Sequence, residues 1–166
     1  MNEQYEIKRT QTMVLIALMT ALIASITMFV KIPLPYGYLN LGDFVIMVAA
    51  IILPFRGAMF AAGIGSAMAD LMSGYPQYAI FTLFIKAFEV VIIFLLRKHI
   101  DTPKRALPFG MAALMMVLSY ATIDAFLVGN IQYFFVSALQ NAAQGIISAG
   151  MMVLLYPRIK HIKKYL

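Results

Sequence analysis

Five ionisable side chains lie within, or at the edge of, long apolar stretches of the sequence: Asp43, Asp70, Lys86, Glu89 and Asp124. A charged side chain at the centre of a membrane helix costs about 2.5–3.5 kcal/mol on insertion scales, so such groups usually face a protein interior or a cavity. Carboxylates and an ammonium group in such a place can hydrogen-bond a polar ligand or carry a proton. We therefore expect these residues to serve a function rather than to face lipid.

Helical spacing places further polar side chains on the same faces. Thr82, Lys86 and Glu89 follow an i, i+4, i+7 pattern, which puts them on one side of a helix. A longer stripe near the end of the chain consists of Ser137, Gln140, Asn141, Gln144 and Ser148. If the stripes converge, they line an outward-facing pocket in a helix bundle. The alternative is that they only tie helices together, but interhelical hydrogen bonds in membranes average about 0.6 kcal/mol, which is small against the insertion cost.

The expected pocket has four acids and one lysine, so it carries a negative excess. This charge suits a neutral or weakly basic small molecule with several hydrogen-bonding groups. Tyrosines near the outer ends of the segments could stack on a ring of the ligand: Tyr36, Tyr38, Tyr75, Tyr78 and Tyr133.

The elements that must position these residues are membrane helices. The chain has 166 residues, of which 63% are hydrophobic and 12% charged, whereas soluble domains are about 45–50% apolar and about 25% charged. This composition argues against a soluble enzyme, a disordered chain and a nucleic-acid-binding domain. The absence of cysteine excludes thiolate chemistry. No phosphate-binding loop, metal-binding motif or catalytic constellation occurs, so we expect no catalytic residue, metal or cofactor.

Six apolar segments predict an all-α membrane protein with six transmembrane helices, forming a single domain over residues 1–166. Strands are not expected, because the segments are continuously apolar and a membrane barrel needs alternation. The second segment is short, so we expect it to tilt or to lie where the bilayer is thinned. The segments are 10–30, 41–53, 57–73, 78–96, 107–128 and 133–156.

The distribution of Lys and Arg predicts the orientation, because cytoplasmic loops are enriched in both. With both termini cytoplasmic, all the basic residues but Lys31 and Lys86 lie on the cytoplasmic side. The outer loops are then 31–40, 74–77 and 129–132. The cytoplasmic basic residues are Lys8, Arg9, Arg56, Arg97, Lys98, Lys104, Arg105, Arg158, Lys160, Lys163 and Lys164.

The first segment and the loop after it differ from the rest. Ala17, Ala21 and Ser25 recur every four residues, and small residues at this spacing let another helix approach closely. We expect this row to dock a helix, although alanine is common in any membrane helix. The loop contains Pro35, Tyr36 and Tyr38, which form either an interfacial tyrosine belt or a lid over the pocket.

The chain resembles the substrate-binding (S) components of energy-coupling factor (ECF) vitamin transporters over nearly its whole length. The resemblance rests on the six-segment size, on the row that begins Ala17-xxx-Ala21, and on the stretch YLNLGD, residues 38–43. It also rests on the run GIGSAMADLMSGYPQYAIFTLFIKAFEVVI, residues 63–92. That run is similar to the branch with riboflavin, hydroxymethylpyrimidine and vitamin B6 carriers.

The resemblance implies a multi-pass protein of the bacterial plasma membrane that captures a vitamin with high affinity. It implies a membrane T component and two ATPase subunits as partners, and no nucleic acid. The alanine row would be the docking surface and loop 31–40 the gate. The outer halves of the last three helices would contact the ligand. Ser25 departs from the alanine expected at the third position of the row.

For the substrate we expect pyridoxine-like B6 vitamers or hydroxymethylpyrimidine, with riboflavin next. Two other readings stay open: a stand-alone proton-coupled secondary transporter working through Asp70, Glu89 or Asp124, and, more weakly, a membrane enzyme using Lys86 and Glu89. The expected substrate-binding residues are Asn40, Asp43, Asp70, Tyr78, Lys86, Glu89, Asp124, Asn141 and Gln144.

Overall fold

A computed structural model describes residues 3–34 and 37–161 of the chain. Six helices account for most of the described residues, and a pair of short strands follows the first helix. The elements are α1 (Glu3–Phe29), β1 (Lys31–Leu34), β2 (Gly37–Asn40), α2 (Gly42–Ile52), α3 (Phe55–Met72), α4 (Pro76–Leu95), the short 3-10 helix η1 (Arg97–His99), α5 (Ala106–Val128) and α6 (Gln132–Ile159).

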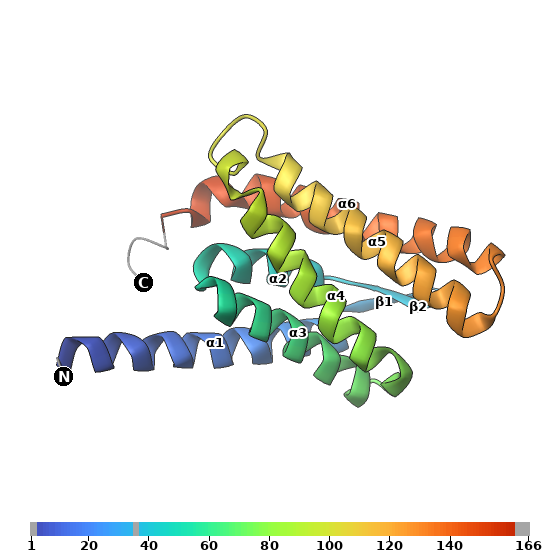
Figure 1. The fold of residues 1–166 in the computed structure, drawn as a ribbon, viewed down its shortest axis with the longest axis horizontal. Helices are drawn as coiled ribbons and strands as arrows, with labels where there is room; N and C mark the ends of the chain where they lie inside the picture. The colour runs from blue at the N-terminus through green and yellow to red at the C-terminus, as the bar shows by residue number, and fades with distance from the viewer. Residues whose placement is uncertain (1–2, 35–36, 162–166) are drawn as a thin grey trace.

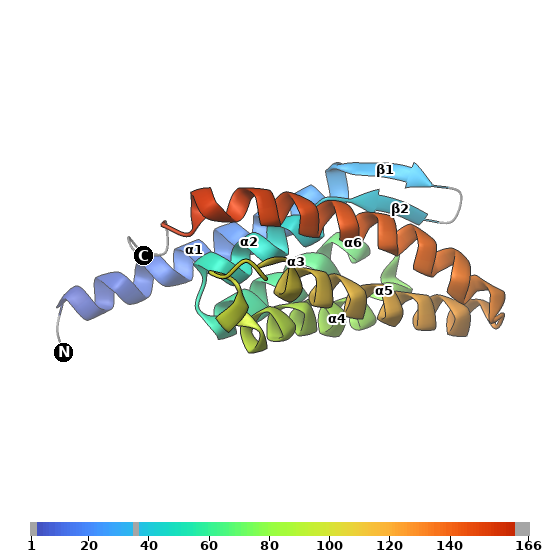
Figure 2. The ribbon, with the colours of Figure 1, turned by 90° about the horizontal axis from the view of Figure 1, so that it is seen from above.

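The six helices run up and down along one long axis (Figures 1 and 2). We call the end where α1 begins and α6 ends the terminal end, and the end with β1, β2 and the α5–α6 turn the hairpin end. The principal helix pairs are α5 with α6, α3 with α4, and α1 with α3. The short α2 contacts α1, α3, α4 and α6, so it lies in the middle of the bundle.

Four helices are long and apolar enough to cross a membrane: Ile7–Phe29, Pro76–Leu95, Ala106–Val128 and Gln132–Ile159. The helix α2 has 11 residues and is therefore about 16 Å long, about half the thickness of a bilayer core. The short second apolar segment of the sequence, 41–53, correctly predicted a short helix here. The six expected helices are thus present, and four of them have the dimensions of full spans.

Local sequence explains several helix ends. Proline at the first position of α4 suits a helix start, where its missing N–H is not needed. Pro54 follows the last residues of α2 and lies outside that helix, as expected for a residue that cannot continue it. Gly129 ends α5 in the left-handed conformation, with φ of 70°, which glycine adopts without a steric cost.

Glycines on α3 let this helix pack closely between α1 and α4. A methyl group added at Gly63 would lie 2.8 Å from the carbonyl oxygen of Leu83 on α4. One added at Gly65 would lie 2.7 Å from the carbonyl oxygen of Thr20 on α1. Because both neighbours are backbone atoms, neither can move without shifting a helix. These two glycines therefore fix the spacing of three helices around the bundle core.

The segment after α1 corrects the expectation that the chain has no strands. β1 and β2 form an antiparallel hairpin in which Lys31 pairs with Asn40. Continuously apolar segments exclude strands that cross the bilayer, whereas this hairpin is only four residues long on each side. Pro33 is tolerated in β1 because both strands of a two-stranded sheet are edges. The fold is helical with one small hairpin.

Candidate ligand-binding cavity

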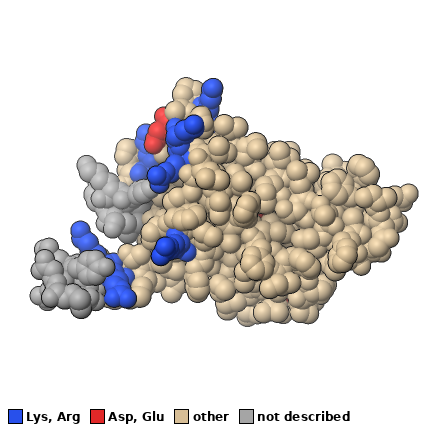
Figure 3. All heavy atoms as spheres, viewed as in Figure 1, with Lys and Arg blue, Asp and Glu red and all other residues tan. Residues whose placement is uncertain are grey.

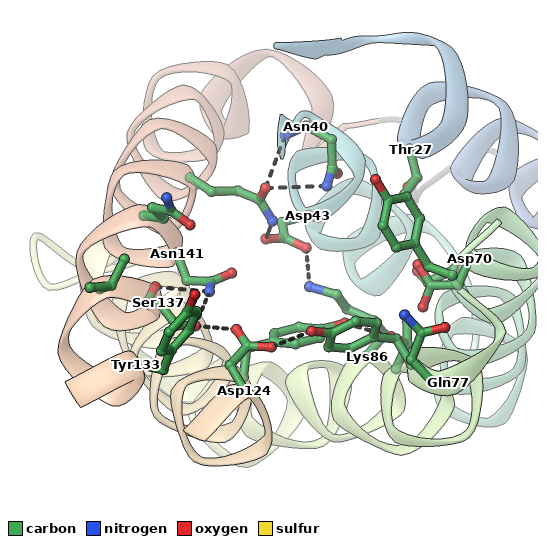
Figure 4. Close-up of a pocket in the computed structure, with 18 of the residues that line it drawn as sticks. Thr27, Asn40, Asp43, Asp70, Gln77, Lys86, Asp124, Tyr133, Ser137 and Asn141 are labelled. Atoms are coloured by element: carbon green, nitrogen blue, oxygen red, sulfur yellow. Dashed lines mark hydrogen bonds and ion pairs between the residues drawn. The ribbon is translucent and has the colours of Figure 1, made fainter. Parts of the chain in front are cut away.

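A cavity of about 300 Å³ lies among the helices at the hairpin end. All six α-helices and the strand β2 contribute side chains to its wall (Figure 4). Eight of the nine residues expected from the sequence line it: Asn40, Asp43, Asp70, Tyr78, Lys86, Asp124, Asn141 and Gln144. The polar stripes therefore converge on one cavity.

Glu89 is the exception, because it lies behind the cavity wall. The ammonium group of Lys86 donates to Glu89 Oε1 at 2.8 Å and also forms an ion pair with Asp43. The side chain of Lys86 is 7% exposed, whereas those of Asp43 and Glu89 are 1% and 0% exposed. Lys86 also lies 5.2 Å from the ring centre of Tyr120, a cation–π distance. Lys86 thus bridges Asp43 in the cavity wall and Glu89 behind it.

Gln144 ties the hairpin to the helices around the cavity. Its Oε1 atom accepts hydrogen bonds from the backbone N–H of Asn40 at 2.9 Å and from the Asn40 side-chain amide at 3.2 Å. Its Nε2 atom donates to Asp43 Oδ2 at 2.8 Å. We call Asn40, Asp43, Lys86, Glu89 and Gln144 the Asp43 cluster. This cluster joins β2, α2, α4 and α6 at one buried point.

The turn between β2 and α2 requires glycine. The Asn40 side chain accepts a hydrogen bond from the Gly42 N–H at 2.7 Å, an Asx-type turn that directs the chain into α2. A methyl group added at Gly42 would overlap with Thr27 Oγ1 and would lie 2.7 Å from Asn40 Oδ1. The close fit of α1 against this turn therefore leaves no room for a side chain.

A second polar group, the Asp124 cluster, joins α4, α5 and α6. The hydroxyl of Tyr78 donates to Asp124 Oδ1 at 2.7 Å, and the hydroxyl of Ser137 donates to Asp124 Oδ2. The Asn141 amide donates to the Ser137 carbonyl at 2.9 Å and to its hydroxyl at 3.0 Å. The cluster consists of Tyr78, Asp124, Ser137 and Asn141. Ser137 is 4% exposed, but Tyr78, Asp124 and Asn141 are only partly buried, so these three face the cavity more openly than the Asp43 cluster does.

Two buried hydroxyl groups in the wall are absent from the binding residues expected from the sequence. Thr27 on α1 is 7% exposed and Ser66 on α3 is 1% exposed. Neither hydroxyl oxygen has a hydrogen-bond partner among the described residues, although both side chains line the cavity. Thr27 is an isolated polar residue in an apolar helix, so no stripe marked it. Ser66 and Asp70 are four residues apart and therefore share a helical face, which is the sequence pattern that indicates Ser66.

The cavity wall contains the acidic side chains of Asp43, Asp70 and Asp124 and the cationic side chain of Lys86. Its formal charge is therefore negative, which is the sign expected from the sequence. Tyr75, Gln77, Tyr120 and Tyr133 add aromatic and amide groups. Within residues 3–34 and 37–161, no three His, Asp or Glu side chains are grouped as ligands of a metal ion.

The row of small residues on α1 lies on the outside of the bundle. Ala17, Ala21 and Ser25 are all exposed, so the face is accessible to another helix. Of the expected lid residues, Tyr38 lies in β2, while Pro35 and Tyr36 lie outside the described residues. The docking and lid roles stay predictions.

Comparison with known proteins identifies one family and one relative. The family described as "ECF-type riboflavin transporter, S component" matches residues 8–163. A protein of Pyrococcus woesei, described as an uncharacterized protein in the gap 3' region, is 39% identical over 141 residues. That match covers 80% of this chain and 93% of the relative.

Proposed function

The chain belongs to the S components of ECF-type riboflavin transporters, and from this premise we propose that it captures riboflavin in the cavity at the hairpin end. Membership makes it a multi-pass membrane protein and a binding subunit of a transporter, not an enzyme. The observation that carries the proposal is a cavity of about 300 Å³ with both tyrosine and amide groups in its wall. Cavities of this size are at the lower end of those that hold small molecules.

The chemistry of riboflavin suits the groups in the wall. Its flat three-ring system can stack on tyrosines such as Tyr78 and Tyr120. The hydrogen-bonding edge of the ring system suits Asn141 and Gln140, which offer donors and acceptors. Its neutral polyol arm suits the hydroxyls of Thr27 and Ser66. The family match gives no support to the single-ring vitamins, pyridoxine and hydroxymethylpyrimidine, that the sequence favoured.

We infer the orientation from the basic residues. Figure 3 shows Lys and Arg gathered toward the terminal end, while the hairpin end is nearly free of them on the face shown. Positively charged residues mark the cytoplasmic side of membrane proteins. The terminal end then faces the cytoplasm, the six helices form the membrane domain, and the cavity receives its ligand from outside.

Binding can be tested with the fluorescence of riboflavin, which falls when the ring system stacks on an aromatic side chain. The purified protein should bind riboflavin with submicromolar affinity, and excess pyridoxine or hydroxymethylpyrimidine should not displace it. Asn141→Ala should weaken binding by about tenfold, the equivalent of about 1.4 kcal/mol for lost ligand hydrogen bonds. Asn130→Ala is the matched control, because Asn130 is exposed and outside the cavity. The absence of riboflavin binding to the unaltered protein would refute the proposal.

We further propose that the exposed row on α1 docks a membrane T component, which couples to two ATPases. Ala17→Trp and Ala21→Trp should abolish ATP-driven uptake into liposomes that contain the whole transporter, while leaving riboflavin binding intact. Leu18→Trp is the matched control, since Leu18 is 61% exposed on another face of the same helix. A loss of binding in the alanine variants would place the row in the ligand site and contradict this assignment.

A further inference from the structure

A second cavity, of about 440 Å³, lies at the terminal end between the last turns of α2, α4 and α6 and the helix η1. It is separate from the riboflavin cavity, because the two share no lining residue. α4 and α6 are long enough to span a bilayer, so their ends lie at the level of the lipid headgroups. The cavity therefore lies where a membrane lipid can reach it.

Two cationic side chains and a histidine line this cavity. Arg97, Lys160 and His161 lie in its wall, and all three side chains are exposed. None of the three forms an ion pair or a side-chain hydrogen bond within the part of the chain that the structure describes. The one acid in the wall, Asp101, accepts a hydrogen bond from the Tyr156 hydroxyl at 2.7 Å. The positive charge of the wall is therefore available to an anion.

The floor of the cavity is apolar. Ile51, Ile93 and Ile100 line it and are 7%, 1% and 7% exposed. Basic residues also attract the negative C-terminal ends of helices, and three helices end here. That attraction can explain why basic side chains lie near helix ends. It does not explain why a cavity with an apolar floor lies beside them. A cationic rim over an apolar floor matches an amphipathic anion.

We infer that this cavity binds the phosphate headgroup of an anionic lipid from the leaflet at the terminal end. The phosphate would lie between Arg97 and Lys160, and the glycerol and first acyl carbons would cover the isoleucine floor. Basic pockets between membrane helices on the cytoplasmic side hold acidic lipid headgroups in this way. A lipid bound here would link α4 and α6 at the end of the bundle opposite the vitamin.

The test is lipid binding to the detergent-solubilised protein, followed by native mass spectrometry with short-chain phosphatidylglycerol. Phosphatidylcholine is the neutral-headgroup comparison. Arg97→Gln/Lys160→Gln should weaken phosphatidylglycerol binding by about 25-fold, from about a fivefold contribution per basic residue. Lys98→Gln/Lys104→Gln is the matched control, because it removes the same charge from the same end but outside the cavity. It should leave the affinity within about twofold.

Three outcomes would overturn the inference. The first is equal binding of phosphatidylcholine and phosphatidylglycerol. The second is an equal loss in the two double variants, which would indicate a diffuse charge effect. The third is binding of glycerol 3-phosphate or inorganic phosphate as tight as that of the lipid, which would make the occupant a soluble phosphate compound. Riboflavin binding, measured on the same samples, should be unchanged, and it reports on the proposed function separately.

Discussion

Replacing Lys86 with methionine should destabilise the protein strongly, whereas replacing Glu89 with glutamine should not. Lys86 is the cation of the Asp43 cluster and contacts both Asp43 and Glu89. Lys86→Met keeps an unbranched side chain but leaves two buried acids without a cation. Glu89→Gln keeps the pair between Lys86 and Asp43, and its amide oxygen can still accept from Lys86.

The size of the effect follows from burial. The carboxylates of Asp43 and Glu89 are 1% and 0% exposed, and removing one partner of a buried ion pair costs about 3–5 kcal/mol. For a chain of this length, each kcal/mol lowers the melting temperature by about 2–4 °C, so Lys86→Met should lower it by about 6–20 °C. Glu89→Gln should change the free energy of unfolding by less than about 1 kcal/mol.

The assay is thermal loss of the helical circular dichroism signal of the ligand-free protein in detergent. Lys98→Met serves as the control, because Lys98 is exposed and has no ion pair among the described residues. The double variant Lys86→Met/Glu89→Gln is decisive. It has one uncompensated acid fewer than Lys86→Met, so it should melt at a higher temperature. A double variant that melts lower than Lys86→Met would refute the electrostatic reasoning.

Two further predictions concern close packing around glycines, and a third concerns a hydrogen bond in the cavity wall. Gly42→Ala should lower the free energy of unfolding by about 1–3 kcal/mol through overpacking, and adding Thr27→Ala should recover part of the loss because Thr27 supplies the nearest atom. Gly65→Ala should be at least as costly, since its methyl group would meet backbone rather than a side chain; both are measured by the same melting assay. Tyr78→Phe removes a donor to Asp124 and should weaken riboflavin binding by about tenfold, as measured by fluorescence titration.

Each of these predictions has a control on the same chain. Gly110→Ala adds a methyl group in the interior of α5 where, apart from the adjoining backbone of α5, no atom of the described residues lies within 4 Å, so it should be neutral or stabilising by up to about 1 kcal/mol. If Gly110→Ala and Gly65→Ala destabilise equally, steric contact is not the cause. Tyr133→Phe removes another tyrosine hydroxyl from the cavity wall. Identical effects of Tyr133→Phe and Tyr78→Phe would argue against a special role of the bond to Asp124.

Hydropathy and helical periodicity predicted the helices well, because lipid requires every spanning segment to satisfy its own backbone. The expected 107–128 segment matches α5, Ala106–Val128. The first segment was expected to start at residue 10, but α1 begins at Glu3, since a helix can continue into water beyond its apolar part. The hairpin was missed because it involves few residues and no long alternating pattern.

The site was predictable where polar residues recur on one helical face. Gln144 and Asn141 belong to such a stripe, and both line the cavity. Periodicity gives the face of a helix but not the depth of a side chain from a cavity, so it could not separate Lys86 in the wall from Glu89 behind it. Thr27 and the cavity at the terminal end depend on contacts between distant segments, which no local pattern contains.

The division of the polar residues into two clusters has a consequence for how specificity can change. The Asp43 cluster holds β2, α2, α4 and α6 together, whereas the Asp124 cluster holds only α4, α5 and α6. Among the described residues, no hydrogen bond joins the two clusters. Under the proposed function, substitutions at Asn141 or Ser137 should therefore alter which molecule is bound without destabilising the Asp43 cluster. Random variation confined to those positions should yield folded proteins with new ligand preferences far more often than variation in the Asp43 cluster.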